Sequence, residues 1–77
     1  MDDALREAKL AALIEIEGYE SVEALMATVI SDSVSPAICM NEDCGFTCEM
    51  EPDQDAGYCD ECRANTMVAA PVLAGLI

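Results

Sequence analysis

The residues of this chain best suited to chemistry are five cysteines, which all fall between Cys39 and Cys62. Their spacing is C-x4-C-x3-C-x10-C-x2-C, in a chain that has no histidine. Two close groups of cysteines are typical of metal sites, and the expected metal for four thiolates is zinc. The spacing therefore predicts one structural Zn²⁺ per chain, held by four of the five cysteines.

The cysteines form a first group of three, Cys39, Cys44 and Cys48, and a second group of two, Cys59 and Cys62. The second group offers one pair of metal ligands, whereas the first group offers three possible pairs. Cys59 and Cys62 form a C-x2-C pair, which can place two sulfurs on one ion from a tight turn. In the first group, any two of Cys39, Cys44 and Cys48 could complete the site. An iron–sulfur cluster, which also uses four thiolates, is an alternative to zinc.

Two features favour the first two cysteines of that group. Gly45 directly follows Cys44, and a glycine there permits the tight turn of a zinc knuckle. The next residues alternate as a strand, with Phe46, Cys48 and Met50 on one face, so Cys48 is predicted to pack as a small apolar side chain. The metal ligands predicted from these features are Cys39, Cys44, Cys59 and Cys62.

The segments that carry these cysteines resemble a known family. Residues 39–47 (CMNEDCGFT) and 51–62 (EPDQDAGYCDEC) are similar to a family of small, uncharacterised bacterial and phage proteins with a zinc-ribbon-like segment. The likeness extends to residues 18–23 and 72–77. It implies the same four ligands and treats Cys48 as a departure from the pattern. No activity is established for that family, so the resemblance implies a metal site and no function.

Two helices are predicted ahead of the cysteines, in residues 2–17 and 22–30. The first is rich in alanine, leucine and glutamate, and Gly18 is placed to end it. Ser21 suits the N-cap of the second helix. Residues 18–20 join the first helix to this N-cap, and a connection this short predicts a helical hairpin.

The apolar face of each predicted helix indicates what the helix packs against. In the first helix this side consists of Leu5, Ala8, Ala12, Leu13 and Ile16, whereas Leu10 and Ile14 fall off the stripe. In the second helix the spacing i, i+3, i+4, i+7 is met by Val22, Leu25, Met26 and Val29. The alternative is a helix-turn-helix that reads DNA, whose second helix would have to present polar side chains to the bases. Residues 22–27 offer one acid and mostly apolar atoms, which favours packing of this helix against the core.

The segments after the helices complete an α+β prediction for one domain, residues 1–77. Residues 1–35 are the helical hairpin and linker, 36–64 a small zinc-ribbon-like β unit, and 65–77 an apolar C-terminal segment. Residues 51–57 are predicted to be a hairpin turn rather than a calcium loop. Residues 67–77 are expected to cover the core, in part also serving self-association or a partner, with Pro71 in the first turn of a helix.

The charge of the chain limits its partners. Three basic residues stand against sixteen acidic ones, and the formal net charge is −13. Nucleic acids are polyanions that proteins bind through Lys and Arg, so direct binding to them is disfavoured. An acidic surface suits docking onto a basic protein.

The sequence also bears on the compartment. The longest uncharged run, residues 64–77, is too short to cross a bilayer, so no membrane association is expected. The acidic start lacks the basic residues of a secretory signal, which predicts a cytoplasmic protein with reduced thiols.

These features together predict a non-enzymatic, zinc-stabilised protein-interaction or accessory module, acting on a protein partner or by self-association. Two features argue against catalysis. The chain has no histidine, which is the usual general base near pH 7, and zinc held by four cysteines has no open position for water. One alternative is a zinc-ribbon transcription or nucleic-acid-associated regulator that acts through a partner. Another is a thiol-redox or metal-responsive protein that uses Cys48 or the Cys59 and Cys62 pair.

Overall fold

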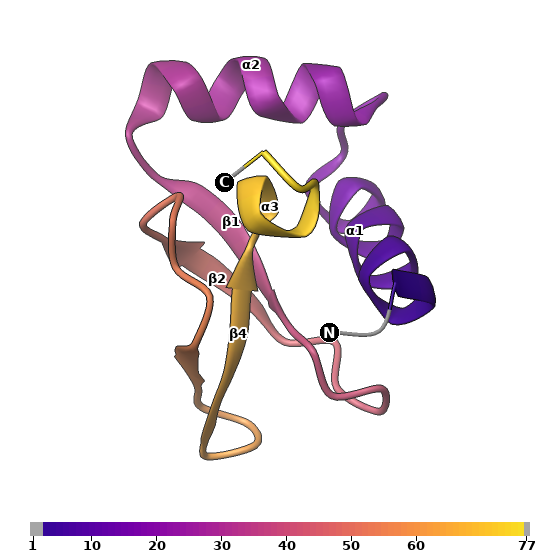
Figure 1. The fold of residues 1–77 in the computed structure, drawn as a ribbon, viewed down its shortest axis with the longest axis vertical. Coiled ribbons are helices and arrows are strands. Elements are labelled where there is room, and N and C mark those ends of the chain that lie inside the picture. Colours follow the sequence, from indigo (N-terminus) through magenta and orange to yellow (C-terminus); the bar gives the residue numbers. More distant parts are fainter. Residues whose placement is uncertain (1–2, 77) are drawn as a thin grey trace.

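Two helices precede a four-stranded antiparallel sheet in the computed structural model, which describes residues 3–76 and, within them, all side chains except those of residues 30–32. The elements are α1 (Asp3–Glu17), α2 (Val22–Asp32), β1 (Ser35–Cys39), β2 (Thr47–Met50), β3 (Gly57–Cys59), β4 (Ala64–Ala69) and α3 (Ala70–Leu73). Figure 1 shows α2 across one end of the sheet, with α1 and α3 beside it. The α+β class is therefore as predicted.

The first helix ends where the sequence predicts. Gly18 has a φ of +78°, a left-handed conformation that a glycine adopts without strain, and Tyr19 donates its backbone N–H to the carbonyl of Ile14 at 3.0 Å. The predicted first residue of this helix, Asp2, lies outside the described residues.

The face that α1 buries differs from the predicted stripe. Lys9 and Leu13, one turn apart, are its buried side chains, and Leu10 and Ile14 pack against the same core. Ile16, by contrast, is 53% exposed. The helix is rotated relative to the prediction because the polar Lys9, rather than an alanine, lies on the buried side.

The second helix forms with its predicted N-cap. The side chain of Ser21 accepts a hydrogen bond from the backbone N–H of Ala24 at 3.2 Å. Leu25 and Val29 are buried, as their spacing predicts. The helix runs to Asp32, two residues past the predicted end, and Ser33 follows with a φ of +63°. In Figure 1, α1 and α2 run in different directions rather than side by side, so the predicted helical hairpin is not formed.

The sheet consists of two hairpins placed side by side. The strand order is β2-β1-β4-β3, so β1 pairs with β2 and β3 pairs with β4, while β1 and β4 join the hairpins at the centre. The connection through residues 51–56 crosses from one edge of the sheet to the other, and the prediction of a hairpin turn there was wrong. Its Gln54 carbonyl accepts from the backbone N–H of Ala69 at 2.9 Å.

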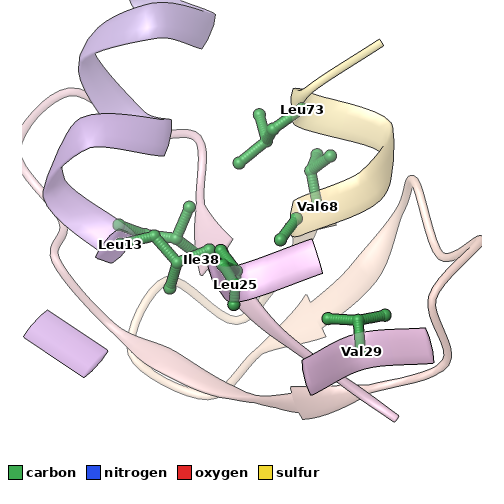
Figure 2. Close-up of a cluster of buried hydrophobic side chains, with 7 residues drawn as sticks. Leu13, Leu25, Val29, Ile38, Val68 and Leu73 are labelled. Carbon is green, nitrogen blue, oxygen red and sulfur yellow. The ribbon is translucent and has the colours of Figure 1, made fainter. Parts of the chain in front are cut away.

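The two central strands divide the core into two clusters. Ile38 of β1 faces Val68 of β4 across the strands, and both side chains point toward the helices. Figure 2 shows them with Leu13 and Leu25 from the helices and Leu73 from α3. Burial of these apolar side chains is what attaches the helices to the sheet.

The opposite face of the central strands is buried although no described helix residue packs on it. Its fully or nearly fully buried residues are Ala37, Cys39, Cys59, Met67 and Ala69, and the predicted strand face of Phe46, Cys48 and Met50 packs against them. The edges of the sheet curl over this cluster. A Cβ at Gly57 in β3 would collide with the Sδ atom of Met50 in β2, although these two strands lie at opposite edges.

The apolar C-terminal segment is core, as expected, but it is not one element. Residues 64–69 form the central strand β4, and Pro71 lies in the first turn of the short helix α3. Leu73 is buried, whereas Leu76 is 65% exposed; Ile77 lies outside the described residues. Within residues 3–76, no helix is long and apolar enough to cross a membrane.

Candidate metal centre

The turns of the two hairpins bring the cysteines together. Cys39 ends β1 and Cys44 lies in the loop to β2, while Cys59 ends β3 and Cys62 lies in the turn to β4. Both turns lie at the end of the sheet away from α2 (Figure 1). The pairing of β1 with β4 therefore places one cysteine pair beside the other.

The four sulfur atoms form one compact cluster. All four Sγ atoms lie within 4.8 Å of one another. Sγ of Cys39 is 3.7 Å from that of Cys62, and Sγ of Cys44 is 3.8 Å from that of Cys59. The structure thus brings together the four cysteines that the sequence predicts as ligands.

These distances fit one tetrahedral ion. Zinc–sulfur bonds of about 2.3 Å place the four sulfurs of a tetrahedral site about 3.8 Å apart. The sulfurs are well beyond the disulfide bond length of about 2.05 Å, and all five cysteines are free thiols. In a four-iron cluster each sulfur would bond to a different iron, which needs a wider set of sulfurs than this one.

Backbone hydrogen bonds shape the two turns. In the first, the N–H of Cys39 donates to the carbonyl of Phe46 at 3.0 Å, and the N–H of Cys44 donates to that of Asn41 at 3.1 Å. In the second, the N–H of Arg63 donates to the carbonyl of Cys59 at 2.7 Å. Arg63, at the end of the second turn, has a left-handed backbone with a φ of +55°. Gly45 in the first turn does not have a positive φ, so it does not supply the left-handed residue of that turn.

Two polar side chains that the sequence pattern does not indicate contact the sulfurs. The hydroxyl of Thr66 lies 3.0 Å from Sγ of Cys39, and the side-chain amide of Asn41 donates to Sγ of Cys62 at 3.3 Å. The backbone N–H of Cys62 also approaches Sγ of Cys59 at 3.4 Å. Such hydrogen bonds orient metal ligands and stabilise negative charge on them.

Two of the four clustered thiols have pKa values shifted in opposite directions: that of Cys39 is lowered and that of Cys44 is raised. Burial acts to raise the pKa of Cys39, but hydrogen bonds from Thr66, Asn41 and two neighbouring thiols outweigh it and lower the value to about 7. A backbone hydrogen bond from Phe46 acts to lower the pKa of Cys44, yet burial and the three other thiols raise it to about 12. Like charges this close disfavour one another, and a divalent cation at the centre would reverse that effect.

Cys48 stands apart from the four. It is half-buried on β2, where it packs with Phe46 and Met50 against the cluster on the sheet face without a helix. Burial raises the pKa of its thiol, and the charges of Asp60 and Cys59 raise it further. A thiol kept protonated is a poor nucleophile, so Cys48 is an apolar packing residue in this structure.

The surface around the centre is acidic. Every aspartate and glutamate whose side chain the structure describes is exposed. Of the three basic residues, Lys9 is buried, Arg6 is half-buried, and only Arg63 is exposed. The accessible charge is therefore even more one-sided than the composition indicates.

Comparisons with protein-family models, curated proteins and solved structures found no match to this chain. No relative therefore supports the resemblance of the cysteine segments to a bacterial and phage family. What the structure does show is four cysteines positioned to hold a metal ion.

Proposed function

We propose that this chain is a non-enzymatic protein-interaction or accessory module whose fold is stabilised by one structural zinc ion. The observation that carries the proposal is the cluster of four Sγ atoms within 4.8 Å of one another, with separations that suit a zinc tetrahedron. Cys39 and Cys59 would hold the ion from the ends of strands, and Cys44 and Cys62 from the turns that follow them.

A structural role suits this donor set better than a catalytic one. Four thiolates complete the tetrahedral coordination of zinc, whereas catalytic zinc keeps one position for water or substrate. Cys39 and Cys59 are fully buried and belong to the apolar cluster of the sheet. An ion held there would cross-link the core, which is what a chain of this size lacks.

The acidic surface supports a basic protein as the partner. Exposed carboxylates surround the fold, and the buried Lys9 contributes no positive charge to the surface. Complementary charge accelerates encounter with a basic partner and repels polyanions.

Native mass spectrometry tests the metal directly. The protein, purified without added metal under reducing conditions, should carry one zinc ion per chain. Denaturation in acid should release the ion and leave the mass of the bare chain, which is the internal control. A folded, metal-free protein would contradict the proposal, and a chain that carries iron would contradict the choice of zinc.

Nucleic-acid binding is expected to be absent. At physiological salt the protein should bind neither duplex DNA nor single strands more tightly than the non-specific range of about 10⁻⁴ M. Few cations are exposed to contact phosphates, and the net charge of −13 opposes the encounter. Fluorescence anisotropy with random-sequence fragments at two salt concentrations measures this. Submicromolar binding that weakens as salt is added would favour a nucleic-acid-associated regulator instead.

A further inference from the structure

Lys9 is a buried lysine that reaches the cysteines from the first helix. Its side chain is only 7% exposed. Its Nζ donates hydrogen bonds to the backbone carbonyls of Asn41 at 2.5 Å and of Cys44 at 2.6 Å. These two residues lie in the loop from β1 to β2, which begins directly after Cys39 and contains Cys44, so α1 is attached to the candidate metal centre through one ammonium group.

No carboxylate of the described residues pairs with the ammonium of Lys9. Among the residues that the structure describes, Lys9 pairs only with those two carbonyls, although the chain is rich in acids. A shallow groove along α1 is lined by both Lys9 and Glu42, yet these two residues form no ion pair. A buried cation is costly unless a negative charge compensates it, so this arrangement calls for a counter-charge close by.

The cysteine cluster can supply that charge. Zinc binds thiolates rather than thiols, and four thiolates with one Zn²⁺ carry a net charge of −2. We propose that Lys9 is the positioning residue and counter-ion of the metal centre: it fixes the first cysteine loop and offsets the negative charge of the loaded site. This inference rests on the proposed function, because it requires that the four cysteines bind a metal.

The hydrogen bonds of the loop show how Lys9 would act. The carbonyl of Asn41 accepts both from Nζ of Lys9 and from the backbone N–H of Cys44. The side chain of Asn41 in turn donates to Sγ of Cys62 in the other hairpin. Lys9 thus holds a residue that links both cysteine pairs, and its loss should loosen the loop as well as remove a charge.

Three variants separate this role from general packing. Lys9→Met keeps an unbranched apolar side chain of similar length and removes the cation and both hydrogen bonds. Arg6→Met removes the same charge from the same helix but touches no hydrogen bond of the loop. Leu13→Ala weakens the packing of α1, where Leu13 is fully buried, without changing charge.

The first readout is zinc affinity, measured in competition with a chromophoric chelator. Lys9→Met should bind zinc about 10- to 100-fold more weakly than the unmodified protein, because it loses two charge-assisted hydrogen bonds. Arg6→Met should stay within about 3-fold, a difference too small to represent even one such bond. Equal losses in the two variants would overturn the inference.

The second readout is the charge-transfer spectrum of the cobalt(II)-substituted protein. A cation near the thiolates stabilises the sulfur electrons, so the sulfur-to-cobalt bands of Lys9→Met should move to lower energy. Leu13→Ala should leave the bands in place, however much it lowers stability. Bands that do not move in Lys9→Met would mean that Lys9 acts by packing alone, and would overturn the counter-ion role.

A measurement on the unmodified protein covers the case in which Lys9→Met does not fold. Lys9 is the sole lysine of the chain, so mass spectrometry reports its acylation without ambiguity. In the zinc-loaded protein, an amine-reactive acetylating reagent should modify the N-terminal amine and spare Lys9. Acetylation of both amines at similar rates would overturn the inference, whereas a protein that binds no zinc would overturn the proposed function with it.

Discussion

Removal of zinc by a chelator is expected to unfold the sheet and to release the helices from it. A structural zinc site contributes apparent binding energies of about 10 kcal/mol or more, which is comparable to the whole stability of a small domain. Without the ion, two fully buried cysteines of the sheet cluster would be left beside two further thiols with no cation between them. The sheet has few large apolar side chains to replace that cross-link.

Circular dichroism under reducing conditions measures the effect. The zinc-loaded protein should melt cooperatively, and addition of excess chelator at 25 °C should abolish the transition. Return of zinc should restore it, which separates metal loss from irreversible damage. A melting curve that is unchanged by a chelator known to have removed the ion would show that the apolar core suffices.

The helices were predictable because their signals are local. The cap at Ser21, the glycine at position 18 and the spacing of Leu25 and Val29 all lie within a few residues of one another. The buried face of α1 was not predictable, because its position depends on the hydrogen bonds of Lys9. These bonds join residues 32 and 35 positions apart in the sequence.

The sheet was predictable only in part, for the same reason. Spacing of the cysteines implies two turns, but not the order of the strands that carry them. Residues 51–56 resemble a hairpin turn because they lie between two strands and are rich in turn formers. They instead link two separate hairpins, since β1 and β4 pair at the centre. That pairing buries Ile38 and Val68 against the helices, a long-range contact that the local sequence does not reveal.

The polar contacts to the sulfurs had no sequence signal. Thr66 lies four residues beyond the last cysteine, and nothing in its surroundings marks it as a partner of Cys39. It reaches that sulfur because β4 pairs with β1. Asn41 lies between two predicted ligands, yet its amide contacts the opposite hairpin. Contacts of this kind follow from topology, which the spacing of ligands leaves open.

Substitution of single cysteines should separate the four clustered thiols from the fifth. Cys39→Ser and Cys59→Ser are each expected to abolish stoichiometric zinc binding at micromolar zinc and to lose the cooperative melting transition. A serine hydroxyl is a much weaker zinc ligand than a thiolate, and at these two fully buried positions it also places a polar group in an apolar cluster.

Cys48→Ala is the matched control, because it removes from the same sheet one thiol that is not among the four clustered sulfurs. It should keep one zinc per chain and cost about 1 kcal/mol, the effect of removing one half-buried atom from a packed face. Metal content by native mass spectrometry and thermal melts on all three variants measure the difference. Loss of zinc from Cys48→Ala together with its retention in Cys39→Ser would mean that Cys48 is a ligand. The ion would then lie deeper in the sheet face that β2 covers, and the hydrogen bond from Thr66 to Cys39 would be a packing contact only.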